Sequence, residues 1–227
     1  MVKKNSGITS LRRPKAKRSL LHGLFIFTEG RFTETEYLRI IENLITSKNG
    51  GALSFHCEYI NPKNKSSPKN IRNSILRTLK GFETLPENSR EVWVLIDKDS
   101  WKQEDIDDLF QLNQLENHKR KVGSINVLMS DPKFEIWLLL HFEEANGVCT
   151  PRDIDIRLKK YLPGYNKHCS ASAFSMESVE IAIQRAKKKE RTESSNVKAP
   201  VYKLIERMIE LGKNQQISPG IFKNNVQ

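Results

Sequence analysis

Three carboxylates stand directly after apolar runs that are typical of buried strands. Glu29 follows the run at 20–28, and Asp97 and Asp99 follow the run at 92–96. Side chains alternate along an extended chain, so Asp97 and Asp99 point to the same side, about 6 to 7 Å apart. Oxygen ligands without His or Cys select Mg²⁺ or Mn²⁺ over zinc. Such an ion neutralises charge on a phosphate while a carboxylate moves a proton, so the pattern predicts phosphoryl chemistry.

Each of these motifs also occurs as a plain solvated turn. An Asp-x-Asp after a strand and a Glu-Gly at a strand end are both common without any function. Their order in one βαβαβ unit, with the basic residue Lys98 between the two aspartates, makes a chance pairing less plausible. The combination therefore favours a metal-phosphate site over two unrelated turns.

The carboxylates need a scaffold that brings distant strand ends together, and the hydrophobic pattern supplies one. Strands are predicted at 20–28, 52–60, 92–96 and 122–129, with amphipathic helices at 33–48, 71–81 and 105–117 and a buried helix opened by Asp131 and Pro132. This regular alternation predicts an α/β fold, a mostly parallel, Rossmann-like sheet with helices on both faces. In such sheets ligands collect at the carboxyl ends of the strands, where these acidic residues lie.

Charge divides the chain into three parts. Residues 1–18 carry 7 Lys or Arg and no acid, residues 19–144 carry 16 basic against 19 acidic residues, and residues 145–227 carry 15 against 8. We interpret them as a flexible basic arm, an α/β catalytic domain and a helical C-terminal region. Two basic flanks around an acidic centre predict nucleic acid as a partner, because Lys and Arg neutralise phosphates. The alternative is that the net charge of +11 serves only solubility.

Other patterns narrow the class of protein. No apolar stretch approaches the ~18 residues of a membrane span, and the N-terminal region lacks the cleavage site of a secretory signal. Three widely spaced cysteines fit reduced thiols, so we expect a cytoplasmic protein without membrane association. The chain has no GxxxxGK[ST], HExxH or GxSxG motif, so it does not itself resemble an ATPase, a zinc protease or an esterase.

Short strings at the predicted strand ends carry a resemblance to known proteins. The run FIFTEG at 25–30, followed by VLIDKD at 94–99, resembles the Toprim domain of topoisomerases, primases and several nucleases. Its signature is a strand-end glutamate and a later strand-end DxD. Longer strings, EGRFTETEYL at 29–38, VWVLIDKD at 92–99 and SDPKFEIWLLLHF at 130–142, are similar to the RloB-like family. The resemblance implies a Toprim-like fold.

The resemblance covers roughly residues 20–142, with a weaker similarity at 194–210. It implies a Toprim-type nuclease that acts in prokaryotic anti-phage or abortive-infection systems. Members of the family are usually encoded beside an ABC-type ATPase, so the resemblance also implies that ATPase as a partner protein.

The family's residues can be carried over by position. Glu29 matches the Toprim glutamate, which implies general acid-base or metal-ligand duty, and Asp97 and Asp99 match the metal-holding pair. Glu135 matches a glutamate in the family's Pro-x-Phe-Glu string and is expected to reach the site, because a buried carboxylate needs a partner. Asp131 is predicted to cap the helix of Glu135 one turn earlier, so that the two carboxylates share a face.

A second tier of residues has a structural explanation beside the functional one. Glu34 belongs to the family's Thr-Glu pair, while Thr33 is predicted to serve as a helix N-cap in a capping box with Glu36. Lys98 and Lys133 are candidates for phosphate contacts, although solvated lysines are commoner.

The sequence thus supports a Mg²⁺- or Mn²⁺-dependent nuclease that cuts DNA or RNA. One alternative is a non-catalytic Toprim module that binds nucleic acid or docks on the ATPase. Another is a toxin component directed at a specific RNA such as tRNA. The choice between DNA and RNA, and whether the chain forms a homo-oligomer, stay open at this point.

Overall fold

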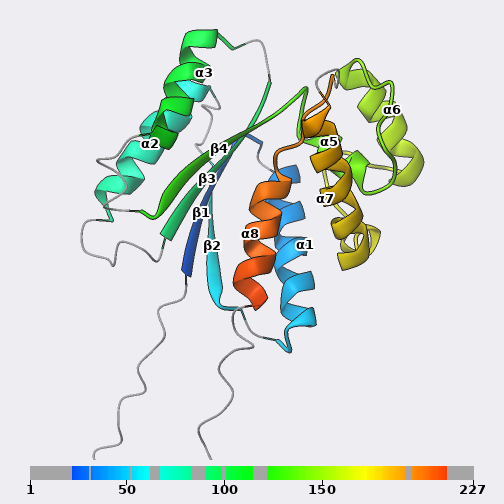
Figure 1. Ribbon diagram of the computed structural model, residues 1–227, viewed down its shortest axis with the longest axis horizontal. Helices are drawn as coiled ribbons and strands as arrows, with labels where there is room; N and C mark the ends of the chain where they lie inside the picture. The colour runs from blue at the N-terminus through cyan, green and yellow to red at the C-terminus, as the bar shows by residue number, and fades with distance from the viewer. Residues whose placement is uncertain are drawn as a thin grey trace, which may run out of the picture.

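A single four-stranded sheet forms the centre of the protein. The computed structural model describes residues 22–30, 32–51, 53–61, 67–82, 90–98, 101–114, 122–192 and 196–213. All strand pairs are parallel, in the order β2-β1-β3-β4 (Figure 1). The strands are β1 (His22–Thr28), β2 (Phe55–Ile60), β3 (Arg90–Asp97) and β4 (Ser124–Ser130). The α/β, Rossmann-like class predicted from the sequence is confirmed.

The register of the two central strands brings their carboxyl ends to one edge. Thr28 of β1 pairs with Leu95 of β3, and the Glu29 N–H donates to the Leu95 carbonyl at 3.1 Å. On the other side of β3, Asp97 pairs with Ser130 of β4. Because the strands are parallel, residues that follow β1 and β3 emerge beside each other.

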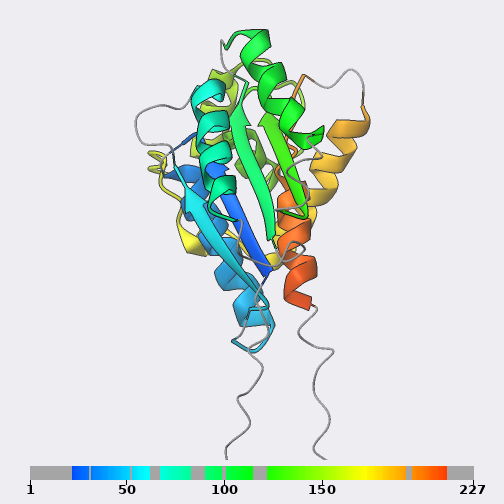
Figure 2. The same cartoon turned by 90° about the vertical axis from the view of Figure 1, so that its left-hand side faces the viewer.

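Helices cover both faces of the sheet. One face carries α2 (Pro68–Lys80), α3 (Gln103–Phe110) and a 3₁₀ turn (Gln111–Gln114) (Figure 2). The other face carries α1 (Thr33–Lys48) and α8 (Tyr202–Lys213), with α5 (Glu135–Leu140), α6 (Pro151–Tyr161) and α7 (Met176–Arg191) on the same side (Figure 1). The C-terminal helices expected from the sequence are therefore present.

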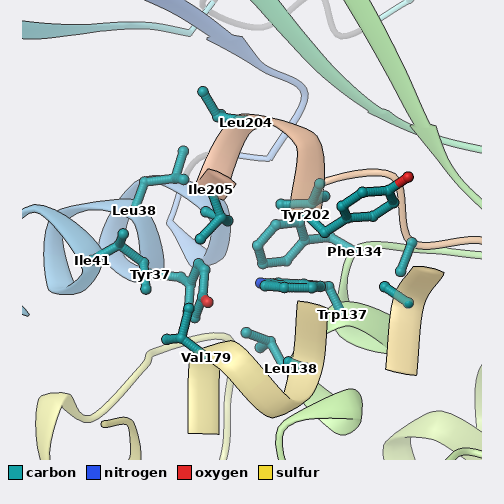
Figure 3. Close-up of a cluster of buried hydrophobic side chains, with 14 of the residues drawn as sticks. Tyr37, Leu38, Ile41, Phe134, Trp137, Leu138, Val179, Tyr202, Leu204 and Ile205 are labelled. Carbon is teal, nitrogen blue, oxygen red and sulfur yellow. The ribbon is translucent and has the colours of Figure 1, made fainter. Parts of the chain in front are cut away.

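Alternating side chains of the central strands feed two separate hydrophobic clusters. Val92, Val94 and Ile96 pack with α2 and α3, while Trp93 and Leu95 pack toward α1. The second cluster continues without a break into the C-terminal helices, as its close-up shows; it includes Tyr37, Leu38, Phe134, Trp137, Leu138, Val179, Tyr202, Leu204 and Ile205 (Figure 3). Helices α5 to α8 thus share one buried core with α1 and the sheet. This packing positions the residues of the C-terminal region relative to the carboxyl edge of the sheet.

α1 has its predicted bounds but not its predicted cap, and α5 begins later than predicted. α1 begins at Thr33 with Phe32 in the capping position, and no side chain caps it. The Thr33 hydroxyl instead donates to the Lys167 carbonyl at 2.9 Å, so tertiary contact replaces the expected capping box. α5 begins only at Glu135, because the backbone of Asp131 forms a two-way antiparallel bridge with Lys198 and is extended.

The third predicted helix also ends early, since α3 stops at Phe110 and a 3₁₀ turn follows. Among the described residues, none of the helices has the length and apolar character that a membrane crossing requires.

Close packing between α1 and α8 makes Gly212 sensitive to substitution. A Cβ at this position would lie 2.5 Å from Ile45 Cγ2 and 2.8 Å from Asn49 Nδ2. We expect Gly212→Ala to lower the free energy of unfolding by about 1 to 2 kcal/mol, because overpacking outweighs the helix propensity gained. Chemical denaturation measures the change, with Lys213→Ala at the neighbouring exposed position as the control. Equal or higher stability of Gly212→Ala would contradict this packing.

Candidate functional site

A pocket of about 370 Å³ opens at the carboxyl edge of the sheet. It lies where β1 and β3 end and where α1 and α5 begin. Four of its lining residues are acidic and one is basic; the lining comprises Glu29, Gly30, Phe32, Thr33, Glu34, Asp97, Phe134, Glu135 and Lys167. The structure therefore brings Glu29 and Asp97, predicted from the strand ends, and Glu135, predicted from the family resemblance, to one cavity together with Glu34.

Backbone amides hold the two strand-end carboxylates. Glu29 Oε2 accepts a hydrogen bond from the Asp97 N–H at 3.0 Å, which joins the end of β1 to the end of β3. Asp97 Oδ1 accepts from the Phe134 N–H at 2.8 Å, just before α5. Each carboxylate is thus positioned by an element distant in sequence, and both are fixed in orientation before any ligand binds.

Burial and neighbouring charge perturb Asp97 strongly. Burial, the largest cause, and the negative charges of Glu34, Glu135 and Glu29 together raise the pKa of Asp97 to about 8. The hydrogen bond from Phe134 opposes it without cancelling it. A carboxylate held in this state either keeps its proton near neutral pH or requires a cation, which is common at functional sites.

Glu34 is buried beside the turn that follows β1. Its Oε1 accepts from the Gly30 N–H at 3.1 Å. Burial raises the pKa of Glu34, the charge of Glu135 raises it further, and the charge of Lys167 lowers it. A Cβ on Gly30 would lie 2.2 Å from Glu34 Oε2, so the glycine of the Glu-Gly pair is needed for this carboxylate to fit.

Glu135 is 2% exposed and is held from the C-terminal region. The Tyr165 hydroxyl donates to its Oε1 at 3.2 Å, and Lys167 Nζ forms a hydrogen-bonded ion pair with the same oxygen. Burial alone would lower the pKa of Lys167, but the hydrogen bond and charge of Glu135 outweigh it and the pKa is raised. Lys167 therefore stays a cation inside an acidic pocket.

Sequence reasoning missed Tyr165 and Lys167. Both lie in the connection between α6 and α7, more than a hundred positions from the end of β1, and no local motif marks them. The backbone of Lys167 has a φ of 77°, which is unusual for a residue with a side chain. That value and the Thr33 hydrogen bond to its carbonyl are visible only in the folded chain.

The second-tier residues other than Glu34 do not line the pocket. Lys98 Nζ pairs with Asp131 Oδ2 at 2.7 Å, and Lys133 Nζ pairs with Asp155 Oδ1 at 2.6 Å. The expected shared face of Asp131 and Glu135 is wrong, because Asp131 precedes the helix in an extended segment. Asp99 lies outside the described residues.

The donor set has the chemistry of a hard-cation site, since its four carboxylates offer only oxygen and Lys167 balances a single charge. Within the described residues, however, no three His, Cys, Asp or Glu side chains form a group that could hold one metal ion. The carboxylates are paired with backbone amides and with Lys167 instead. The ligand atoms and the negative charge of these residues suit Mg²⁺ or Mn²⁺, but the described residues do not form a complete set of ligands around one ion.

The sequence profile of one family, described as RloB-like protein, matches residues 24–208. The chain belongs to the RloB-like family. The matched span runs from β1 into α8 and includes every residue that lines the pocket. No curated protein and no solved structure matches the chain.

The raised pKa of Asp97 predicts a stability gain on removing its charge. Its folded-state pKa of about 8 exceeds the ~3.9 of an unfolded chain, so ionisation of Asp97 disfavours folding increasingly as the pH rises from about 4 to 8. We expect Asp97→Asn, which keeps an acceptor for the Phe134 N–H, to raise the free energy of unfolding at pH 8 by about 1 to 3 kcal/mol.

Denaturation curves at pH 4 and pH 8 measure this effect. The gain should be nearly lost at pH 4, where the carboxyl group is protonated in the folded state and about half protonated in the unfolded state. Asp108→Asn, at an exposed position of α3, is the matched control and should change stability at neither pH. A destabilised Asp97→Asn protein at pH 8 would contradict the electrostatic account.

Proposed function

We propose that this RloB-like protein is a metal-dependent nuclease of the Toprim type that hydrolyses phosphodiester bonds in DNA or RNA. The observation that carries the proposal is the convergence of Glu29, Asp97 and two further carboxylates at the carboxyl edge between β1 and β3. Burial, and then repulsion from the neighbouring carboxylates, raises the pKa of Asp97, and a site of this kind is stabilised by a divalent cation.

Glu29 and Asp97, with Asp99 from the sequence motif, are the residues that would hold Mg²⁺ or Mn²⁺. When bound, the ion would neutralise charge on the phosphate and activate a water or leaving oxygen. The residues of the chain orient the site. The Asp97 N–H fixes Glu29, and the Phe134 N–H fixes Asp97.

Proton transfer would fall to Glu29 or Glu34. Burial raises the pKa of Glu34, so its carboxyl group can hold a proton nearer to neutral pH than an exposed glutamate can. Oε1 is engaged with the Gly30 N–H, which leaves Oε2 as the atom that would carry the proton. Glu135 would act indirectly, by holding Lys167 at the pocket.

Family membership supports a cellular role for the nuclease. We propose that it is the effector of an anti-phage system with an ABC-type ATPase partner, because the chain carries no Walker-type phosphate loop of its own. The basic residues of the two flanks would contact the nucleic-acid backbone.

A non-catalytic role is the second candidate, and one specific observation favours it. The described residues contain no complete metal-binding group. A module that only binds nucleic acid or docks on an ATPase would not need one. The gathering of four carboxylates in one pocket weighs against this alternative, since bringing like charges together costs stability and a module that only binds or docks does not need them.

Cleavage assays test the nuclease directly. Purified protein, with and without the ATPase, is incubated with plasmid, single-stranded DNA and total tRNA in Mg²⁺, in Mn²⁺ and in EDTA. We expect metal-dependent cutting that falls at least ~10³-fold in Asp97→Asn and Glu29→Gln, because both remove charge from the reacting centre. Asp108→Asn should cut normally. Cutting of tRNA alone would identify the RNA-directed toxin, and binding without cutting under all conditions would establish the non-catalytic module.

Metal binding gives a readout that does not depend on activity. Mg²⁺ at about ten times its dissociation constant should raise the melting temperature of the wild type by about 3 to 6 °C, because the ion binds only the folded carboxylates. Asp97→Asn should abolish this shift, whereas Asp108→Asn should preserve it. Equal shifts in all three proteins would mean that Mg²⁺ binds elsewhere.

A further inference from the structure

An exposed aromatic ring stands at the rim of the carboxylate pocket. Phe32 is 53% exposed, the largest exposed fraction among the large apolar side chains of the described residues. The other exposed apolar side chains, such as Ile156, lie away from this pocket, whereas Phe32 lines it. A flat ligand group that packs on this ring would bury its apolar area, and the ring stands beside a polar cavity.

The segment after α6 contacts the first turn of α1 and Phe32, which directly precedes that helix. The His168 ring lies 5.4 Å from the Phe32 ring, and His168 Nδ1 pairs with Glu36 Oε1 at 2.7 Å. The Cys169 N–H donates to the other oxygen of Glu36 at 3.0 Å. Lys167 directly precedes His168. These contacts therefore hold Phe32 and Lys167 at the same pocket opening.

Lys167 supplies the positive charge at this opening. It is the single basic residue among the nine that line the pocket, opposite four carboxylates that would repel a phosphate. Its side chain is 59% exposed despite the ion pair with Glu135, so the ammonium remains accessible to a ligand. The Thr33 hydroxyl holds its backbone carbonyl, which fixes the direction from which the ammonium enters the pocket.

We propose that Phe32 and Lys167 form a nucleotide subsite, in which Phe32 stacks a base and Lys167 binds the adjacent phosphate. Base stacking on an aromatic side chain together with a cation for the backbone is the chemistry of single-strand recognition. A base in a duplex is already stacked and paired, so this subsite selects unpaired DNA or RNA strands. The inference rests on the proposed function for its substrate class, since it places this strand at the reacting carboxylates.

Binding in EDTA tests the subsite without cleavage. Fluorescence anisotropy of the full-length protein is measured with labelled single-stranded DNA and RNA oligonucleotides and with their duplexes. We expect the wild type to prefer single strands, Phe32→Leu to lose about tenfold in single-strand affinity, and Phe32→Tyr to retain it. Lys167→Gln should weaken binding and reduce the slope of log affinity against log salt by about 0.7, the value of one lost phosphate contact.

Matched controls come from exposed positions away from the pocket. Ile156→Ala removes an equally exposed apolar side chain from α6, and Lys80→Gln removes an exposed lysine from the far end of α2. Both should bind like the wild type. The comparison of the DNA and RNA arms identifies which strand the subsite prefers.

The outcomes separate the subsite from the nuclease. Equal affinity for duplex and single strand, together with wild-type binding by Phe32→Leu, would overturn the subsite, and metal-dependent cutting would then leave the nuclease in place. Single-strand binding that depends on Phe32 and Lys167, without any cutting in Mg²⁺ or Mn²⁺, would support the subsite and overturn the nuclease. Absence of nucleic-acid binding by the wild type in EDTA would overturn the subsite, and cleavage in Mg²⁺ or Mn²⁺ would then decide the nuclease separately.

Discussion

Repulsion among the carboxylates of one partly buried pocket is the constraint on which the site depends. Glu29, Asp97, Glu34 and Glu135 line one pocket, and such a group is tolerated only if hydrogen bonds and an opposite charge offset the cost of burial. The fold provides these partners from different places. The amide of Asp97 serves Glu29, the amides of Phe134 and Gly30 serve Asp97 and Glu34, and Lys167 serves Glu135. The parallel register of β1 and β3 is what makes the first of these contacts available.

The C-terminal helices are part of this arrangement as well as of the core. The connection between α6 and α7 carries Lys167, and it is anchored on α1 through Thr33 and Glu36. One hydrophobic cluster runs from the sheet through α1 and α5 into α7 and α8, so the position of the cation is fixed by packing over a long stretch of chain. The C-terminal region, which the sequence indicates as a separate basic part, therefore contributes the positive charge of Lys167 to the carboxylate pocket.

Local signals in the sequence located the elements well and their ends less well. The unbroken apolar run before Asp97 predicted a strand buried on both faces, and its residues do divide between two clusters. The capping predictions failed at Thr33 and Asp131 for one physical reason. A short polar side chain or free backbone that suits a helix cap also suits a tertiary hydrogen bond, and here contacts with Lys167 and Lys198 took precedence.

The sequence by itself determined the β-α alternation, the parallel sheet and the strand ends at which Glu29 and Asp97 stand, because hydrophobic periodicity and chain direction are local properties. Family strings added Glu135 to the same set. Only the tertiary structure decided that Glu34 faces the same pocket, that Lys98 and Lys133 pair outside it, and that Phe32 and Lys167 share its opening. Those outcomes depend on contacts between residues far apart in the sequence, and no local spacing encodes which of many lysines and aromatic rings the packing will bring to one place.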